Sequence, residues 1–239
     1  MQASTVSHAQ NPEFQHATRI HQALTAGVEK RILCWIAART PGWISSDQLT
    51  ALGLVAQCLA GLFYAVADTH PLALVGASVA IALNWLGDSL DGTIARLRHQ
   101  ERPRYGFYVD HVVDIIGSVA MMAGLACSGL VHPQVAMAML VAFLVLSAES
   151  YLATYTVGRF EMAHSYFGPT EIRLLLIAGN LQLLRSQFAP ILGHKFLLFD
   201  VGGIIATAAM ALMALVTAGR HTLQLFNAEP LPRTPALKR

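Results

Sequence analysis

Four aspartates lie close together in an apolar part of the chain: Asp88, Asp91, Asp110 and Asp114. Residues three or four positions apart share one face of a helix, so each pair presents two carboxylates in one direction. The segment between the pairs is short enough to bring the two helix ends together. We therefore expect the four carboxylates to converge on one volume.

Carboxylates that are buried together repel one another and are costly to desolvate unless cations compensate them. Mg²⁺ and similar hard cations prefer carboxylate oxygens and keep positions open for water and substrate phosphates. Two such ions can stabilise the attacking and leaving oxygens of a phosphoryl displacement. His and Cys are missing from the cluster, which argues against zinc. We predict two divalent cations, Mg²⁺ or Mn²⁺, and a transfer of a phosphate-bearing group.

The residues around the aspartates indicate a pocket for a nucleotide. Gly92 and Ala95 keep one helix face bare, so that a flat or bulky ligand can approach the backbone. Arg96 offers a planar guanidinium that suits a diphosphate. Gly106, four residues before Asp110, leaves space where a side chain would block the ligand.

These residues form one continuous pattern, Asp88-x-x-Asp91-Gly92-x-x-Ala95-Arg96, then nine residues, then Gly106-x-x-x-Asp110-x-x-x-Asp114. The pattern resembles the signature of the CDP-alcohol phosphotransferases, also called CDP-alcohol phosphatidyltransferases. The resemblance implies that the acceptor oxygen attacks the phosphorus distal to cytidine and that CMP leaves.

The resemblance also implies roles for single residues. Asp88 and Asp110 would bridge the two ions, Asp91 would complete one coordination sphere, and Asp114 would complete the other. Asp114 would also be the catalytic base for the acceptor hydroxyl. The residues implied to line the CDP pocket are Gly92, Ala95, Arg96 and Gly106.

The elements that must hold these residues are membrane helices, because 54% of the 239 residues are hydrophobic and only 13% are charged. A spanning helix needs about 20 mostly apolar residues. Six stretches qualify, near 48–67, 71–90, 109–130, 133–157, 170–185 and 197–219. We predict an all-α integral membrane protein with six transmembrane helices. The aspartates then lie where the second span ends and the third begins.

The chain divides into three predicted parts. Residues 1–45 form a lead-in in which Glu29 to Arg39 reads as an interfacial amphipathic helix, with a plain polar lead-in as the alternative. Residues 46–220 form the six-helix domain. Residues 221–239 are Pro-rich and basic, which predicts a disordered cytoplasmic tail.

Basic residues collect in alternate loops, for example at Arg96 to Arg104 and at Arg159, whereas the opposite loops hold few. Cytoplasmic loops are enriched in Lys and Arg. We therefore expect a multi-pass protein of the cell (inner) membrane, with both termini and the active site on the cytoplasmic side. The chain has no dense basic face of the kind that binds nucleic acid. We expect the partners to be membrane lipids, the CDP-linked substrate and a second copy in a homodimer.

Four further polar residues occur in apolar surroundings. Asn84, one turn before Asp88, is a candidate nucleotide-binding residue, and a hydrogen bond to a neighbouring helix is the alternative. Glu171 and Arg173 enter an apolar stretch, where ionisable side chains are costly and usually functional, so we place them on the acceptor side. The alternative for Glu171 is a helix-capping role. Glu149 requires a partner, either a charged head group or an Arg or hydroxyl of another helix.

The predicted reaction leaves the substrates open. With CDP-diacylglycerol as donor, the acceptor is a small polar alcohol such as glycerol phosphate, inositol phosphate or serine. The alternative is a CDP-choline or CDP-ethanolamine type of donor with diacylglycerol as acceptor. A divalent-cation transporter is a third possibility, although such a site is expected near the bilayer midplane between repeats, and no repeat is visible. A non-catalytic scaffold is disfavoured because all four aspartates are present.

Overall fold

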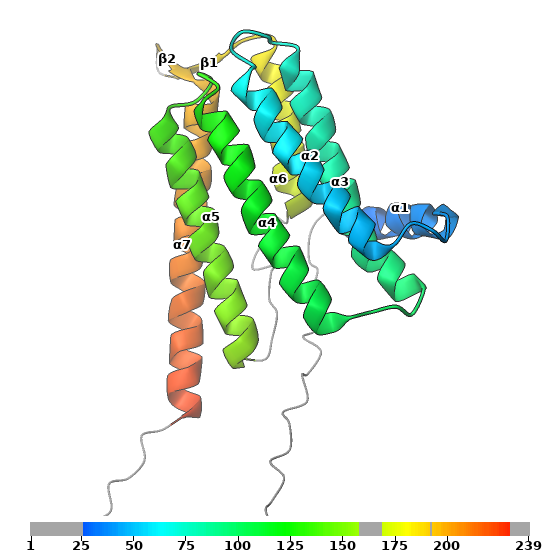
Figure 1. Ribbon diagram of the computed structural model, residues 1–239. Coiled ribbons are helices and arrows are strands. Elements are labelled where there is room, and N and C mark those ends of the chain that lie inside the picture. Colours follow the sequence, from blue (N-terminus) through cyan, green and yellow to red (C-terminus); the bar gives the residue numbers. More distant parts are fainter. Residues whose placement is uncertain (1–25, 158–168, 192, 230–239) are drawn as a thin grey trace, which may run out of the picture.

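Helices make up almost all of the described chain, which in this computed structural model comprises residues 26–157, 169–191 and 193–229. They are α1 (Ala26–Arg39), α2 (Ser46–Ala65), α3 (Ala73–Leu97), α4 (Pro103–Ala126), α5 (Pro133–Val157), α6 (Pro169–Leu183) and α7 (Leu198–Ala228). Two short strands, β1 (Phe188–Ile191) and β2 (His194–Leu197), lie between α6 and α7 (Figure 1). The predicted lead-in up to residue 25, Arg159 and the tail from residue 230 lie outside the described residues.

Five of the described helices are long and apolar enough to cross a bilayer: α2, α3, α4, α5 and α7. The six predicted spans are therefore not confirmed. The stretch expected as the fifth span contains α6, which has 15 residues and is roughly 22 Å long, short of a bilayer core of about 30 Å. In Figure 1, α6 begins part-way along α3 and ends near the strands, and α7 returns from there.

The prediction of an all-α chain is wrong at one place, the connection between α6 and α7. There β1 and β2 pair antiparallel, with Phe188 opposite Leu197 and Ile191 opposite His194. Aromatic and branched side chains favour strands, and Gly193 in the turn adopts a φ of +84°, which favours glycine. The last helix also continues to Ala228, beyond the predicted end of the span at residue 219.

Helices α2, α3 and α4 pack closely because glycines stand where the backbones meet. A methyl group on Gly87 of α3 would lie 2.7 Å from the backbone oxygen of Leu49 on α2. Further along α2, a methyl group on Gly61 would lie 2.5 Å from the backbone oxygen of Ala120 on α4. Small residues permit this kind of approach between membrane helices. The residue after Gly87 is Asp88, so this packing also places the site.

A buried polar chain connects α2, α6 and α3. The Tyr64 hydroxyl donates a hydrogen bond to Oδ1 of Asn180 at 2.9 Å, and Nδ2 of Asn180 donates to the Ser78 hydroxyl at 3.2 Å. Asn180 has no exposed surface. Polar groups buried in a membrane must be satisfied within the protein, so this chain fixes α6 against the other two helices.

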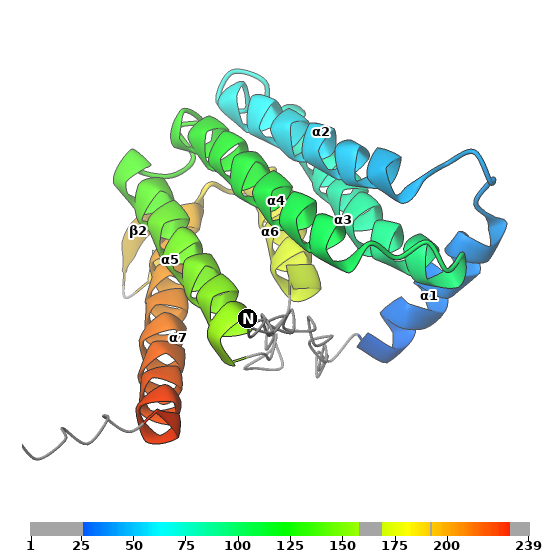
Figure 2. The same ribbon diagram turned by 60° about the horizontal axis from the view of Figure 1, so that its bottom comes forward.

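Helices α5 and α7 form a separate pair on the far side of α4 from α2 (Figures 1 and 2). A side-chain contact links them, with His221 Nδ1 at hydrogen-bonding distance, 2.6 Å, from Glu149 Oε1. The partner of Glu149 is thus a histidine rather than the head group, arginine or hydroxyl considered from the sequence. A cavity of about 960 Å³ lies along the pair, and its lining is almost entirely apolar.

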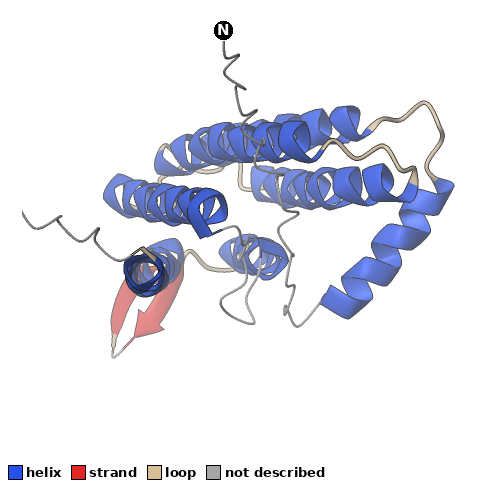
Figure 3. Cartoon of the chain, turned by 90° about the horizontal axis from the view of Figure 1, so that it is seen from below, coloured by secondary structure: helices blue, strands red, loops and turns tan. Residues whose placement is uncertain are grey.

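Helix α1 lies across one end of α3 and diverges from the direction of the bundle (Figure 3). Its Leu33 and Ala37 are buried in a cluster with Leu90 and Ile94 of α3. On the opposite side, Trp35 is 60% exposed. The helix predicted from Glu29 to Arg39 is therefore present, with one face packed against the protein and another open.

Two arginines between α3 and α4 contact the loop between α1 and α2 and the start of α2. Arg98 donates hydrogen bonds to the backbone oxygens of Ile44 at 2.6 Å and of Thr40 and Pro41 at 3.0 Å. Arg102, just before α4, forms an ion pair with Asp47 in the first turn of α2. The hydrogen bond between the Arg102 guanidinium and Asp47 raises the pKa of Arg102.

Candidate active site

Three of the four predicted aspartates come together where α3 ends and α4 begins. Asp88, Asp110 and Asp114 each offer a carboxylate oxygen, and these oxygens lie within 4.8 Å of one another. Asp110 and Asp114 occupy successive turns of α4, as their spacing predicts. All three side chains are partly exposed.

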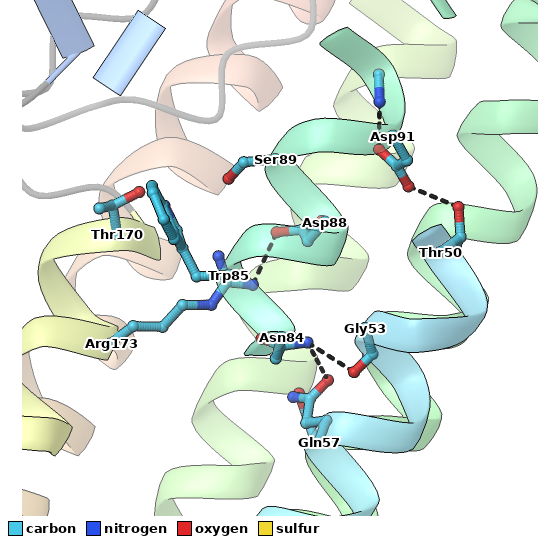
Figure 4. A network of polar contacts seen from close by, with 12 residues as sticks. Thr50, Gly53, Gln57, Asn84, Trp85, Asp88, Ser89, Asp91, Thr170 and Arg173 are labelled. Atoms are coloured by element: carbon cyan, nitrogen blue, oxygen red, sulfur yellow. Dashed lines mark hydrogen bonds and ion pairs between the residues drawn. The ribbon is translucent and has the colours of Figure 1, made fainter. Parts of the chain in front are cut away.

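Asp91 points away from this group toward α2. The Thr50 hydroxyl donates a hydrogen bond to its Oδ2 at 2.6 Å, and the Gly92 backbone N–H donates to its Oδ1. Figure 4 shows Asp91 facing Thr50, while Asp88, one turn earlier, faces α6. The structure therefore gathers three carboxylates and places the fourth beside them, buried at 8% exposure.

A guanidinium from α6 reaches the aspartate group. Arg173 Nη2 lies 2.7 Å from Oδ2 of Asp88, and the two side chains are 16% and 25% exposed (Figure 4). Glu171, in the first turn of the same helix, is 8% exposed. The two ionisable residues predicted on the acceptor side thus enter the structure from the helix that faces Asp88.

The residues predicted to bind the nucleotide lie on the last turns of α3 and the first turn of α4. Arg96 is exposed and donates to the Thr93 hydroxyl at 3.3 Å. A methyl group on Gly92 would lie 3.3 Å from Nη1 of Arg96, so this guanidinium lies over the glycine. Gly106 is open, with no protein atom within 4 Å of the position of a methyl group. Ala95 is half-buried.

Asn84 forms hydrogen bonds to a neighbouring helix, which was the alternative to nucleotide binding. Its Nδ2 donates to the backbone oxygen of Gly53 at 3.0 Å and to Oε1 of Gln57 at 3.4 Å (Figure 4). Gln57 in turn donates to the Ser118 hydroxyl of α4 at 3.2 Å. Asn84 is buried, at 6% exposure, and connects α3 to α2 and α4 one turn from Asp88.

The sequence analysis did not identify three residues that lie at the site. Thr50 binds Asp91 from α2. The ring of Tyr151 on α5 packs perpendicular to that of His111 on α4, with 4.4 Å between centroids. Glu29 of α1 accepts hydrogen bonds from two helices of the site. Each approaches from a helix distant in sequence, so no local spacing could have identified it.

The donor set fits a hard divalent cation. Within the described part of the chain, the group of possible ligands contains carboxylates alone. Mg²⁺ and Mn²⁺ prefer such oxygen donors, and the partial exposure leaves room for substrate oxygens as further ligands. Asp88 and Asp110 come from different helices, so a cation held there would also join α3 to α4.

Residues 43–219 match the sequence profile of CDP-alcohol phosphatidyltransferases, which covers most of the chain. The chain belongs to the CDP-alcohol phosphatidyltransferase family. A search of curated proteins finds no match to the chain. The match spans α2, α3, α4, α5 and α6 and much of α7, and so includes every residue of the aspartate group.

Family membership defines the class of reaction. A CDP-alcohol phosphatidyltransferase is a transferase of substituted phosphate groups, which moves a phosphoalcohol from a CDP-linked donor with release of CMP. The family is typically metal-dependent, in agreement with the three carboxylates. The transporter alternative loses its support, because the aspartates are those of a transferase family.

Proposed function

We propose that this enzyme transfers the phosphatidyl group of CDP-diacylglycerol to a hydroxyl of a small polar acceptor that carries an anionic group, with release of CMP. Arg173 is the observation that favours this reaction. Its guanidinium lies beside the aspartate group but on another helix than Arg96. A neutral diacylglycerol acceptor brings no charge for it, whereas glycerol phosphate, inositol phosphate and serine each do.

The proposed donor side is the end of α3 with the start of α4. Arg96 contacts the diphosphate, and Gly92, Ala95 and Gly106 leave room for the nucleotide. Asp88, Asp110 and Asp114 would hold the divalent cations, and Asp91 would complete the ligand set from its position against Thr50. Asn84 acts here as a packing residue, because its amide is engaged with α2.

The proposed transfer is a single in-line displacement. Bound divalent cations would stabilise the negative charge on the oxygens of the diphosphate. Asp114 accepts the proton of the acceptor hydroxyl, and that oxygen forms a bond to the phosphorus distal to cytidine. The bond from this phosphorus to the CMP oxygen breaks, and CMP leaves. Arg173 holds the anionic group of the acceptor, so that the chain chiefly positions the reactants.

The proposed setting is the cell (inner) membrane, with the aspartate group on the cytoplasmic side. Trp35 and Val28, both exposed on α1, would enter the membrane interface, where amphipathic helices bury apolar side chains. The cytoplasmic location of both termini follows from the distribution of basic residues. We also propose a homodimer, formed between apolar helix faces within the bilayer.

Glu171 favours a second candidate, a CDP-choline or CDP-ethanolamine type of transfer onto diacylglycerol. Glu171 lies two residues before Arg173 on α6 and is 8% exposed, and a buried carboxylate would suit a cationic head group. In this reaction the lipid is the acceptor and the soluble CDP-alcohol is the donor.

A crossed substrate panel tests the two candidates. The purified enzyme in lipid nanodiscs is given CDP-diacylglycerol with glycerol 3-phosphate, inositol phosphate or serine, and separately CDP-choline or CDP-ethanolamine with diacylglycerol. CMP release is measured with Mg²⁺, with Mn²⁺ and with EDTA. We expect metal-dependent CMP release with CDP-diacylglycerol and an anionic acceptor. Turnover only with the soluble donors would replace our proposal with the second candidate.

A further inference from the structure

Glu29 connects the surface helix α1 to α3, which carries Asp88, and to α6, which faces Asp88. Its Oε1 accepts hydrogen bonds from Trp85 Nε1 at 3.1 Å, from the Ser89 hydroxyl at 3.3 Å and from the Thr170 hydroxyl at 3.1 Å. The second oxygen also lies within reach of Thr170, at 3.2 Å. One carboxylate thus receives hydrogen bonds from three side chains on α3 and α6.

The three donors lie close to Asp88 and Arg173 in the sequence. Trp85 and Ser89 are one turn apart on α3 and stand on either side of Asp88 in the sequence. Thr170 is one turn before Arg173 on α6. Figure 4 shows Trp85 and Thr170 side by side, next to the Arg173–Asp88 pair. Glu29 therefore binds both the part of α3 around Asp88 and the start of α6. The distance between these two parts decides whether Arg173 can reach Asp88.

The attachment of α1 to the protein does not depend on Glu29 alone. Leu33 and Ala37 bury the middle of α1 against α3, and Arg98 binds the carbonyls that follow the helix. The distinctive contribution of Glu29 is its hydrogen bond to α6. A role in setting the position of α6 explains this contact, whereas a role in docking α1 needs only the bonds to α3.

We propose that Glu29 is a positioning residue that acts through Thr170 and Arg173 on the cation site. By fixing the start of α6 against α3, it keeps the Arg173 guanidinium on Asp88, where the guanidinium competes with a divalent cation. The inference rests on the proposed cation-binding role of Asp88. When a cation is bound, the displaced guanidinium becomes available to the acceptor.

Mn²⁺ binding to the full-length protein, measured by electron paramagnetic resonance without either substrate, tests this. We expect Glu29→Ala to tighten Mn²⁺ binding roughly threefold to tenfold, because Arg173 is released from Asp88. Simple electrostatics predicts the opposite sign, since the loss of a carboxylate should weaken cation binding. Glu29→Gln keeps an acceptor oxygen and should stay close to wild type, whereas a pure charge effect would make it resemble Glu29→Ala.

Three further variants locate the effect. Thr170→Val removes only the α6 end of the connection and should tighten binding like Glu29→Ala. Arg173→Ala should tighten it as well, and Glu29→Ala should add nothing in that background. Glu101→Ala removes an exposed carboxylate of the α3–α4 loop and serves as the charge-matched control.

The outcomes separate this inference from the proposed function. Unchanged or weakened binding in both Glu29→Ala and Thr170→Val, with normal binding by the wild type, overturns the role of Glu29 alone. An absence of Mn²⁺ binding by the wild type contradicts the cation site and this inference together. Thermal unfolding of each variant identifies misfolded protein, and Thr170→Val gives the answer if Glu29→Ala does not fold.

Discussion

The α2–α3–α4 unit and the α5–α7 pair are held together in different ways. In the first, glycines bring backbones into contact, and buried amides and hydroxyls connect neighbouring helices. In the second, the His221–Glu149 hydrogen bond and apolar contacts join two long helices that leave a cavity of about 960 Å³ beside them. The three gathered aspartates all belong to the first region.

The difference shows where this enzyme requires geometric precision. Carboxylates that share a cation must be held within a fraction of an ångström, and close backbone packing with satisfied polar groups provides that rigidity. The α5–α7 pair contributes Tyr151, which packs against His111, the residue after Asp110, and elsewhere presents mostly apolar side chains. Substitutions should therefore have large effects in the first region and small effects in the second.

The largest effect is expected from Asp110→Asn. We propose that Asp110 is shared between cations; a neutral amide cannot replace its carboxylate there, so CMP release should fall by roughly a thousandfold or more. The protein should still purify as a folded species, because the side chain is partly exposed. Near-normal turnover would contradict the proposed role of Asp110 and remove the reason for the rigidity of this region.

Asp114→Asn should lower kcat by roughly a hundredfold to a thousandfold, because the amide cannot accept the proton of the acceptor hydroxyl. Steady-state kinetics with both substrates varied separates this effect from a loss of binding. An unchanged kcat with a raised KM would exclude Asp114 as the catalytic base.

Gly87→Ala tests the backbone contact itself. The added methyl group meets Leu49 and Gly53 of α2, so α3 must shift beside Asp88, at a cost of roughly 1–3 kcal/mol. We expect a lower Tm and about a tenfold loss of activity. The matched control is Gly219→Ala in α7, where a methyl group meets no protein atom within 4 Å. Equal effects of the two substitutions would show that the contact with α2 is not the cause of the loss.

Glu149→Gln should have the smallest effect. It weakens the bond to His221, and side-chain hydrogen bonds between membrane helices contribute only about 0.6 kcal/mol on average. Activity should stay within about twofold of the wild type, and the Tm should fall slightly. A loss of activity comparable to that of Gly87→Ala would show that the α5–α7 pair also positions the site.

The sequence predicted the aspartate group well because its spacing is local. Asp110 and Asp114 are one turn apart on a helix, and the short loop before them returns the chain to Asp88. The same reasoning did not separate Asp91 from Asp88, since helical spacing alone does not show which neighbour each side chain meets. Thr50 on α2 decides the position of Asp91, and it lies 41 residues away.

Apolar composition predicted the long helices but not what interrupts them. The fifth stretch, 170–185, was counted as a span although its helix α6 has only 15 residues, and hydropathy does not show the antiparallel hairpin that follows. Beyond residue 219, the predicted end of the span, α7 carries His221, whose partner Glu149 lies 72 residues earlier. Long-range partners of this kind are visible only once the helices are packed.

Arg98 satisfies two demands that are normally discussed apart. For the insertion machinery it is one positive charge in a short loop, and a lysine would serve equally well. For the folded protein it is a forked donor to three carbonyl oxygens, a geometry that a single ammonium group does not reproduce. An Arg98→Lys protein should therefore enter the bilayer in the correct orientation but pack α1 less tightly against α3. This one substitution would separate membrane insertion from the packing of the folded protein.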